Sequence, residues 1–172
     1  EIHHMTTLSG LTHEEVLREL RDVGLGSLPG GGAEVFADRV RRLVAPGKEH
    51  LDFWFHTHRT AHALGIPTHC TMLYGHVETY EERVDHLLRL RALQDETGGF
   101  TAFACWLTQP DGVPEEHIYP KKMTPGVYLR VQALSQRLLG DQRLESGDRL
   151  GVAPGGELGV DRQLDRPQVK LL

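Results

Sequence analysis

The sequence is poor in cysteine and has neither a long apolar run nor a surplus of basic residues. Its two cysteines, Cys70 and Cys105, lie far apart, which excludes a CxxC metal site or a disulfide framework and indicates a reducing, cytoplasmic setting. No stretch approaches the roughly 20 apolar residues that cross a bilayer, so we expect no membrane span. The 19 basic and 24 acidic residues are interspersed, unlike the basic face of a nucleic-acid-binding protein.

The sequence does contain clear helix signals. Thr12 and Glu15 form a capping-box pattern before residues with helical spacing, and Thr79 and Glu82 repeat this pattern before a longer helix. Residues 50–64 have the pattern of another helix. A chain of 172 residues has room for one core, and these helices are expected to cover it.

Strand-like runs alternate with the helices. They cover residues 25–28, 68–74 and 100–107, and each one leads into a helix, the first of which is expected over residues 35–43 with Arg39, Arg41 and Arg42 on its polar side. A (β/α) barrel uses about 30 residues per unit, and the starts of successive predicted strands are separated by a similar number of residues. We therefore predict an α/β fold of about three βα units, which is either part of a barrel or a small open sheet.

The character of the sequence changes after residue 110. One more helix is expected to start at Thr124-Pro125. From residue 140 onward Gly, Asp, Arg, Gln and Pro dominate and no periodicity persists. We therefore divide the chain into residues 1–110 and a divergent helical or irregular tail, residues 111–172.

Three polar segments follow the predicted strands, where the loops of an α/β barrel converge. The first contains Gly30, Gly31 and Gly32, which allow close backbone approach to a ligand, followed by the carboxylate of Glu34. Its alternative interpretation is a flexible turn before a helix.

The second and third polar segments lie after the other two strands. His76 and Glu78 follow residues 68–74 and could hydrogen-bond a ribose, an amino group or a reacting proton. They could equally cap the following helix. Gln109 closes the third segment, with Trp106 as an aromatic face that is more typical of a core.

Two histidines raise the question of a metal site. His58 and His62 are four residues apart on a predicted helix, which is a suitable spacing for metal ligands. Residues 58–62 lack the Glu of the HExxH zinc motif, however, and the spacing indicates no third ligand. We therefore interpret both as packing or surface histidines and predict no metal site.

Four of these segments occur in an order that resembles a known family. They are residues 24–34 (GLGSLPGGGAE), 58–62 (HRTAH), 71–79 (TMLYGHVET) and 93–100 (LQDETGGF). This series resembles the aminofutalosine synthases, radical S-adenosylmethionine (SAM) enzymes of menaquinone biosynthesis. The cyclic dehypoxanthinyl futalosine synthases and the deazaflavin synthases share weaker versions. The resemblance covers residues 1 to about 110.

The resemblance implies a fold, cofactors and a transferase reaction. The family's fold is a (β/α) barrel in which three cysteines of a CxxxCxxC loop hold a 4Fe-4S cluster, and the cluster cleaves SAM to a 5′-deoxyadenosyl radical. In aminofutalosine synthase this radical adds to the enol ether of 3-[(1-carboxyvinyl)oxy]benzoate and gives aminodeoxyfutalosine with loss of carboxylate. The implied contacts to SAM or substrate are Gly30, Gly31, Gly32, Glu34, Thr71, Tyr74, His76, Glu78 and Gln109.

The chain also departs from the family. It contains no CxxxCxxC, so we expect it to be a C-terminal barrel fragment that is inactive alone and needs a missing N-terminal barrel half as its partner. It begins with Glu1, and residues 68–72 read THCTM where the family usually has TNATM. Two alternatives stay open, namely the cyclic futalosine synthase and a noncatalytic small-molecule-binding domain without the cluster.

Overall fold

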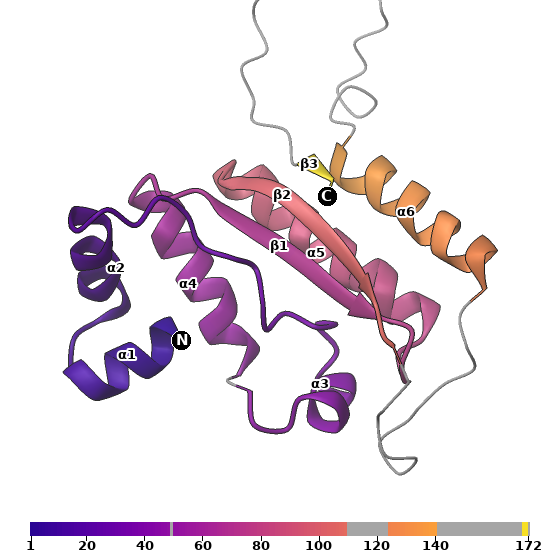
Figure 1. Cartoon of the computed structure of the whole chain (residues 1–172), viewed down its shortest axis with the longest axis horizontal. Coiled ribbons are helices and arrows are strands. Elements are labelled where there is room, and N and C mark those ends of the chain that lie inside the picture. The colour runs from indigo at the N-terminus through magenta and orange to yellow at the C-terminus, as the bar shows by residue number, and fades with distance from the viewer. Residues whose placement is uncertain (49, 110–123, 141–169, 172) are drawn as a thin grey trace, which may run out of the picture.

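A computed structural model describes residues 1–48, 50–109, 124–140 and 170–171. Its centre is a parallel sheet in which β1 (Thr68–Tyr74) lies beside β2 (Phe100–Leu107) (Figure 1). A short strand, β3 (Lys170–Leu171), pairs in parallel with β2 on its other side. The predicted bounds of β1 and β2 are confirmed.

Helix α5 (Tyr80–Thr97) connects β1 to β2, because parallel strands need a crossover of this kind. The predicted capping box is present: Thr79 Oγ1 accepts from Glu82 N, and the Glu82 side chain accepts from Thr79 N. The helix ends at Gly98, which has a left-handed φ of 65°. Its buried leucines, among them Leu87 and Leu90, belong to the main core, and each contributes about 1.5–3 kcal/mol.

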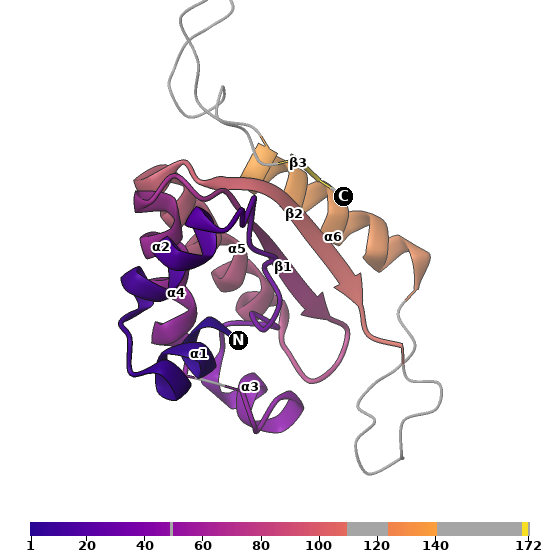
Figure 2. The same cartoon turned by 60° about the vertical axis from the view of Figure 1, so that its left-hand side comes forward.

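The other helices lie on both sides of the two strands. Figures 1 and 2 show α2 (His13–Asp22) and α4 (Leu51–Ala63) on the β1 side and α6 (Pro125–Gly140) on the β2 side. These three were predicted, whereas the first helix, α1 (Ile2–Ser9), was not. A second core cluster joins α2 to α4, and its buried members are Leu17, Leu28, Ala61 and Ile66.

The first predicted strand is wrong. Of residues 25–28 only Leu28 pairs, in an isolated parallel bridge with Thr68. The chain still follows β1 afterward, since Leu73 N donates to Glu34 O at 3.1 Å. Pro29, which has no N–H group, and the glycines that follow explain why no regular ladder forms.

The helix predicted over residues 35–43 is shifted. Helix α3 covers Asp38–Val44, because Val35 and Phe36 extend into the main core before the first turn. The main core also contains every second side chain of β1, namely Cys70, Met72 and Tyr74. No helix in the described part of the chain is long and apolar enough to span a bilayer. The architecture is α/β with parallel strands, and most of the predicted tail lies outside the described residues.

Candidate functional site

A cavity of about 630 Å³ lies between α1, residues 28–32 and the start of α4. Its lining includes two of the predicted site residues, Gly31 and Gly32, and two cations, Arg41 and Lys48. The other lining residues include four histidines and two aromatic residues: His3, His4, His50, His58, Phe53 and Trp54. The cavity therefore combines glycine backbone, cationic groups and aromatic faces, which suits a small polar ligand.

The glycine run is shaped by its contact with β1. A Cβ on Gly30 would lie 2.4 Å from His69 O and 2.5 Å from Cys70 Cα, so only glycine fits there. Gly31 has no neighbour at the equivalent position. Thr71 Oγ1 donates to Gly30 O at 2.9 Å. The structure thus joins two predicted site residues, Thr71 and Gly30, through a hydrogen bond that fixes the loop on the strand.

Glu34 forms an ion pair at the edge of this cavity. Its Oε1 lies 2.9 Å from Lys48 Nζ, and the Lys48 side chain passes over Gly32. Glu34 has a left-handed φ of 50°, which is unusual for a residue with a side chain and costs of order 1 kcal/mol. Such conformations cluster at ligand sites, so this observation favours the predicted role of Glu34.

Arg41 was expected on the polar side of its helix, and this is wrong. Arg41 is only 8% exposed, and its Nη1 donates to Gly32 O at 2.7 Å and to Ala33 O at 3.0 Å. Burial lowers the pKa of Arg41, while the Glu34 charge raises it. The guanidinium therefore holds the end of the glycine segment in place.

His76 and Glu78 lie elsewhere, in a buried cluster after β1. Glu78 accepts hydrogen bonds from Gly75 N at 2.6 Å, His76 N at 2.8 Å and Arg83 Nε at 2.6 Å. Burial alone would raise the pKa of Glu78, but the hydrogen bonds from His76 and Gly75 and the Arg83 charge lower it to about 2. The cluster shapes the loop that precedes α5, and contact of its members with a ligand stays a prediction.

Tyr74 and Gln109 complete the predicted set. Tyr74 is fully buried, with the Arg83 guanidinium 5.2 Å from its ring centre, and its hydroxyl has no hydrogen-bond partner among the described residues. Burial, helped by nearby Cys105, raises the pKa of Tyr74 to about 12. Gln109 is exposed just after β2 and donates to Leu107 O at 3.4 Å. Neither residue lines the cavity.

The two helix histidines pack against the sheet. His58 is 3% exposed and His62 is half-buried, and both hydrogen-bond Thr68 Oγ1 at 2.8 Å. Among the described residues no three His, Cys, Asp or Glu side chains are grouped so that they could hold a metal ion.

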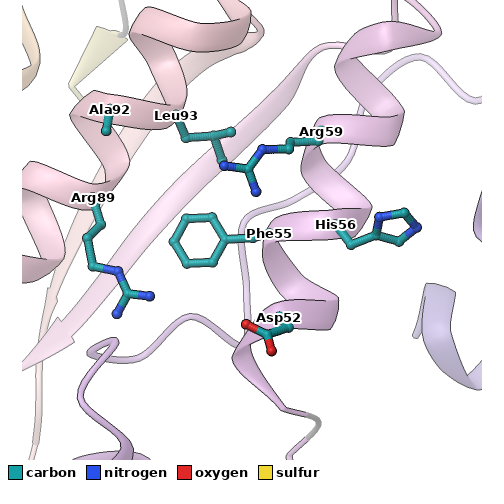
Figure 3. A pocket seen from close by; sticks show the side chains of 7 residues that line it. All are labelled: Asp52, Phe55, His56, Arg59, Arg89, Ala92 and Leu93. Atoms are coloured by element: carbon teal, nitrogen blue, oxygen red, sulfur yellow. The ribbon is translucent and has the colours of Figure 1, made fainter.

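A second, smaller pocket of about 390 Å³ lies between α4 and α5 (Figure 3). Arg59 and Arg89 lie on either side of the Phe55 ring, 5.7 and 5.1 Å from its centre. Arg59 is already paired with Glu96 through two hydrogen bonds. This pocket contains none of the predicted site residues.

The sequence interpretation did not identify several residues of the cavity. Lys48 follows a Pro-Gly turn, and the only available signal was a lone cation between two predicted helices. Trp54 and Phe53 belong to the apolar pattern of a helix, and His3 and His4 lie in a helix that was not predicted. Only the spatial arrangement brings these side chains to the glycine segment.

Comparisons with known proteins show that the chain belongs to the radical SAM superfamily. The superfamily pattern matches residues 1–90. Within this class the chain is similar to the aminodeoxyfutalosine synthase of Thermus thermophilus, with 58% identity over 112 residues, 65% of this chain and 30% of the relative. The enzyme of the same name from Streptomyces coelicolor is 46% identical over 147 residues, 85% of this chain and 36% of the relative. The predicted resemblance is confirmed.

A transferase whose name gives another reaction is also similar. The 5-amino-6-(D-ribitylamino)uracil–L-tyrosine 4-hydroxyphenyl transferase of Methanopyrus kandleri is 48% identical over 103 residues, 60% of this chain and 28% of the relative. The chain spans about a third of the length of the curated relatives it matches.

The described residues do not fit an iron–sulfur cluster. Both cysteines, Cys70 and Cys105, are buried in the strands, and Cys70 Sγ donates to Ala102 O. Burial raises the pKa of Cys70 and raises that of Cys105 to about 11. Cluster ligands are thiolates, so these two thiols are unsuited to that role.

Proposed function

We propose that this chain is part of a radical SAM transferase that adds a 5′-deoxyadenosyl group to 3-[(1-carboxyvinyl)oxy]benzoate and forms aminodeoxyfutalosine, with loss of a carboxylate, for menaquinone biosynthesis. The observation that carries the proposal is the 58% identity to an aminodeoxyfutalosine synthase over 112 residues. The 48% identity to the tyrosine 4-hydroxyphenyl transferase supports a second candidate, the transfer of a tyrosine-derived group.

The proposal assigns residues 1–110 to the C-terminal part of a (β/α) barrel. SAM and a 4Fe-4S cluster, when bound in the intact enzyme, supply the adenosyl radical. Because Cys70 and Cys105 do not fit as cluster ligands, those ligands must come from a partner segment, the N-terminal barrel half. This chain alone is then expected to be inactive.

The contribution of this chain is to bind and orient. Lys48 and Glu34 present an ammonium and a carboxylate side by side, which suits the carboxylate and amino groups of SAM or the carboxylates of the substrate. The backbone of Gly31 and Gly32 lets a ligand approach closely. Phe53 and the Trp54 ring cover it from α4 and help to exclude water from the reacting atoms.

The remaining residues predicted to contact SAM or substrate lie outside the cavity, and the proposal places their action in and after the two strands. His76 and Glu78 would act at the carboxyl end of β1, and Gln109 at the end of β2. Thr71 and Tyr74 would act from within β1. Glu78 already accepts hydrogen bonds on both oxygens, so its contribution is expected through the position of His76.

The test starts with the complete coding region. Sequencing across both ends of this segment should reveal an in-frame CxxxCxxC motif upstream, and its absence would contradict the enzyme proposal and favour the noncatalytic binding domain. The full protein, with its cluster reconstituted, is then given SAM and each candidate substrate. Aminodeoxyfutalosine as product supports the first candidate, a tyrosine-derived product the second, and a cyclic futalosine would replace both.

A matched pair of variants tests the site in that enzyme. Glu34→Gln should lower turnover at least tenfold, because the carboxylate that faces Lys48 is lost. Glu96→Gln changes an exposed carboxylate that pairs with Arg59 and should leave turnover within twofold. Equal activity of both variants would remove Glu34 from the site.

A further inference from the structure

Four side chains form a continuous hydrogen-bonded chain beside the cavity. His58 Nδ1 lies 2.8 Å from Thr68 Oγ1, and the same oxygen lies 2.8 Å from His62 Nε2. His62 Nδ1 lies 2.6 Å from Thr97 Oγ1, which donates to Leu93 O at 2.7 Å. This series of hydrogen bonds therefore begins at His58, which lines the cavity, and ends at a backbone carbonyl of α5.

The carbonyl at the end fixes the direction of every proton. A carbonyl can only accept, so the single hydroxyl proton of Thr97 points to Leu93 O. His62 must then donate from Nδ1, which leaves its Nε2 as an acceptor for the Thr68 hydroxyl. Thr68 Oγ1 in turn accepts from His58 Nδ1–H. The series of hydrogen bonds thus selects the His58 tautomer in which Nδ1 carries the proton and Nε2 carries a lone pair.

Both histidines are neutral, so each ring carries one proton and one lone pair. Burial lowers the pKa of His58 to about 3, with a further decrease from nearby His62, and burial lowers that of His62 to about 4. The His62 ring is also closely packed against Gly99, because a Cβ at position 99 would lie 2.1 Å from the ring. Glycine at position 99 is what allows the ring to lie between the two threonines.

The remaining nitrogen of His58 is available to the cavity. Nδ1 is taken by Thr68, and no donor among the described residues reaches Nε2, although His58 lines the cavity. Trp54 lines the same cavity with its ring centre 4.0 Å from that of His58. Trp54 Nε1 is a buried donor without a hydrogen-bond partner in the described ranges. This wall of the cavity therefore offers one acceptor, His58 Nε2, whereas Trp54 Nε1 has almost no accessible surface.

We propose that His58 positions the ligand of this cavity by accepting a hydrogen bond at Nε2 from a ligand hydroxyl, and that the Thr68–His62–Thr97 chain fixes the tautomer that makes this bond. A hydroxyl can donate to the neutral His58 Nε2 without bringing a charge into this buried wall. Within the proposed function, on which this inference rests, the hydroxyls of the adenosyl ribose are the candidates.

The first experiment is ¹⁵N NMR of the histidine-labelled chain without substitutions. We expect His58 to carry its proton on Nδ1 and to have an unprotonated Nε2. A proton on Nε2 would overturn the inference directly. Thr68→Val removes the hydroxyl at nearly constant shape and should release His58 into a mixture of tautomers, whereas Thr68→Ser should keep the wild-type state.

The second experiment compares two probes, adenosine and 2′,3′-dideoxyadenosine, which differ only in the ribose hydroxyls. Adenosine should shift the His58 Nε2 resonance and bind about tenfold more tightly, since a buried hydrogen bond to a neutral acceptor has that magnitude. In Thr68→Val the preference should shrink to about twofold. Equal binding of the probes, or no binding of adenosine, would overturn the ligand contact.

These outcomes are separable from the proposed function. If the hydroxyl preference is found and the full protein forms none of the predicted products, the proposed function fails and His58 belongs to a nucleoside site of another activity. If the products form and the preference is absent, the proposed function stands and the role of His58 fails.

Discussion

The β1–α5–β2 unit and the segment of residues 28–50 differ in how they satisfy their polar groups. In the first, Glu78 is surrounded by donors, and His86 Nε2 donates to Thr71 O at 3.0 Å. In the second, the glycine segment forms no ladder and Lys48 reaches the cavity with 48% of its side chain exposed. The regular unit holds its carboxylate Glu78 in buried hydrogen bonds, and the irregular segment presents the partly exposed Lys48 to the cavity.

Two ion pairs show this contrast in energetic terms. The side chains of Arg83 and Glu78 are 9% and 0% exposed, whereas those of Lys48 and Glu34 are 48% and 15% exposed. Breaking a buried pair strands a charge away from water, but breaking an exposed one does not.

The largest effect is expected for Arg83→Met. The variant leaves the Glu78 carboxylate buried without its cation and should lower the free energy of unfolding by about 3–5 kcal/mol. Urea denaturation followed by circular dichroism measures this. The control is Arg39→Met, because Arg39 pairs with Glu82 at 2.7 Å with 49% of its side chain exposed, and a loss below about 1 kcal/mol is expected there. Similar losses in both variants would refute the contrast.

The next effect tests the glycine segment. Gly30→Ala places a methyl group against the backbone of His69 and Cys70, which should cost about 1–3 kcal/mol of unfolding free energy. Gly31→Ala meets open space and should change it by less than about 0.5 kcal/mol. The same denaturation curves measure both. If the two variants are equally stable, residues 28–34 do not pack on β1 as described.

The third effect depends on pH. Burial lowers the pKa of His86 from 6.5 to about 3. Between these two pH values His86 is therefore protonated in the unfolded chain and neutral in the folded chain. Stability is therefore complete above pH 6.5 and falls as the pH decreases toward 3. His86 alone should cost about 2 kcal/mol at pH 5 relative to pH 7.

The variant His86→Gln isolates the contribution of His86 to the pH dependence of the free energy of unfolding. A glutamine amide can donate to Thr71 O but does not titrate, so the decrease between pH 7 and pH 5 should shrink by about 2 kcal/mol. Each protein is compared with itself at the two pH values, which removes the packing cost of the substitution. An unchanged decrease would mean that His86 is already protonated in the folded chain.

The same division explains which parts of the fold could be predicted. The strands β1 and β2 and the helix α5 follow from capping boxes, periodicity and glycine stops, all of which are local signals. The site follows less well, because Arg41 turns inward to two carbonyl groups and Lys48 is brought to Glu34 by a loop. The buried His58 and the half-buried His62 could be recognised as packing residues, but their hydrogen bonds to Thr68 depend on a sheet position that spacing alone does not give.

The smallest effect on stability is expected at the cavity itself. Lys48→Gln removes the partner of Glu34, but both groups reach solvent, so the free energy of unfolding should fall by less than about 1 kcal/mol. In the full protein, however, the affinity for SAM or substrate should decrease about tenfold, because the ammonium that faces a ligand carboxylate is lost. Urea denaturation and equilibrium binding measure the two quantities separately. If Lys48→Gln destabilises the chain as much as Arg83→Met and leaves ligand affinity unchanged, the Glu34–Lys48 pair is a structural brace and the irregular segment is not the binding region.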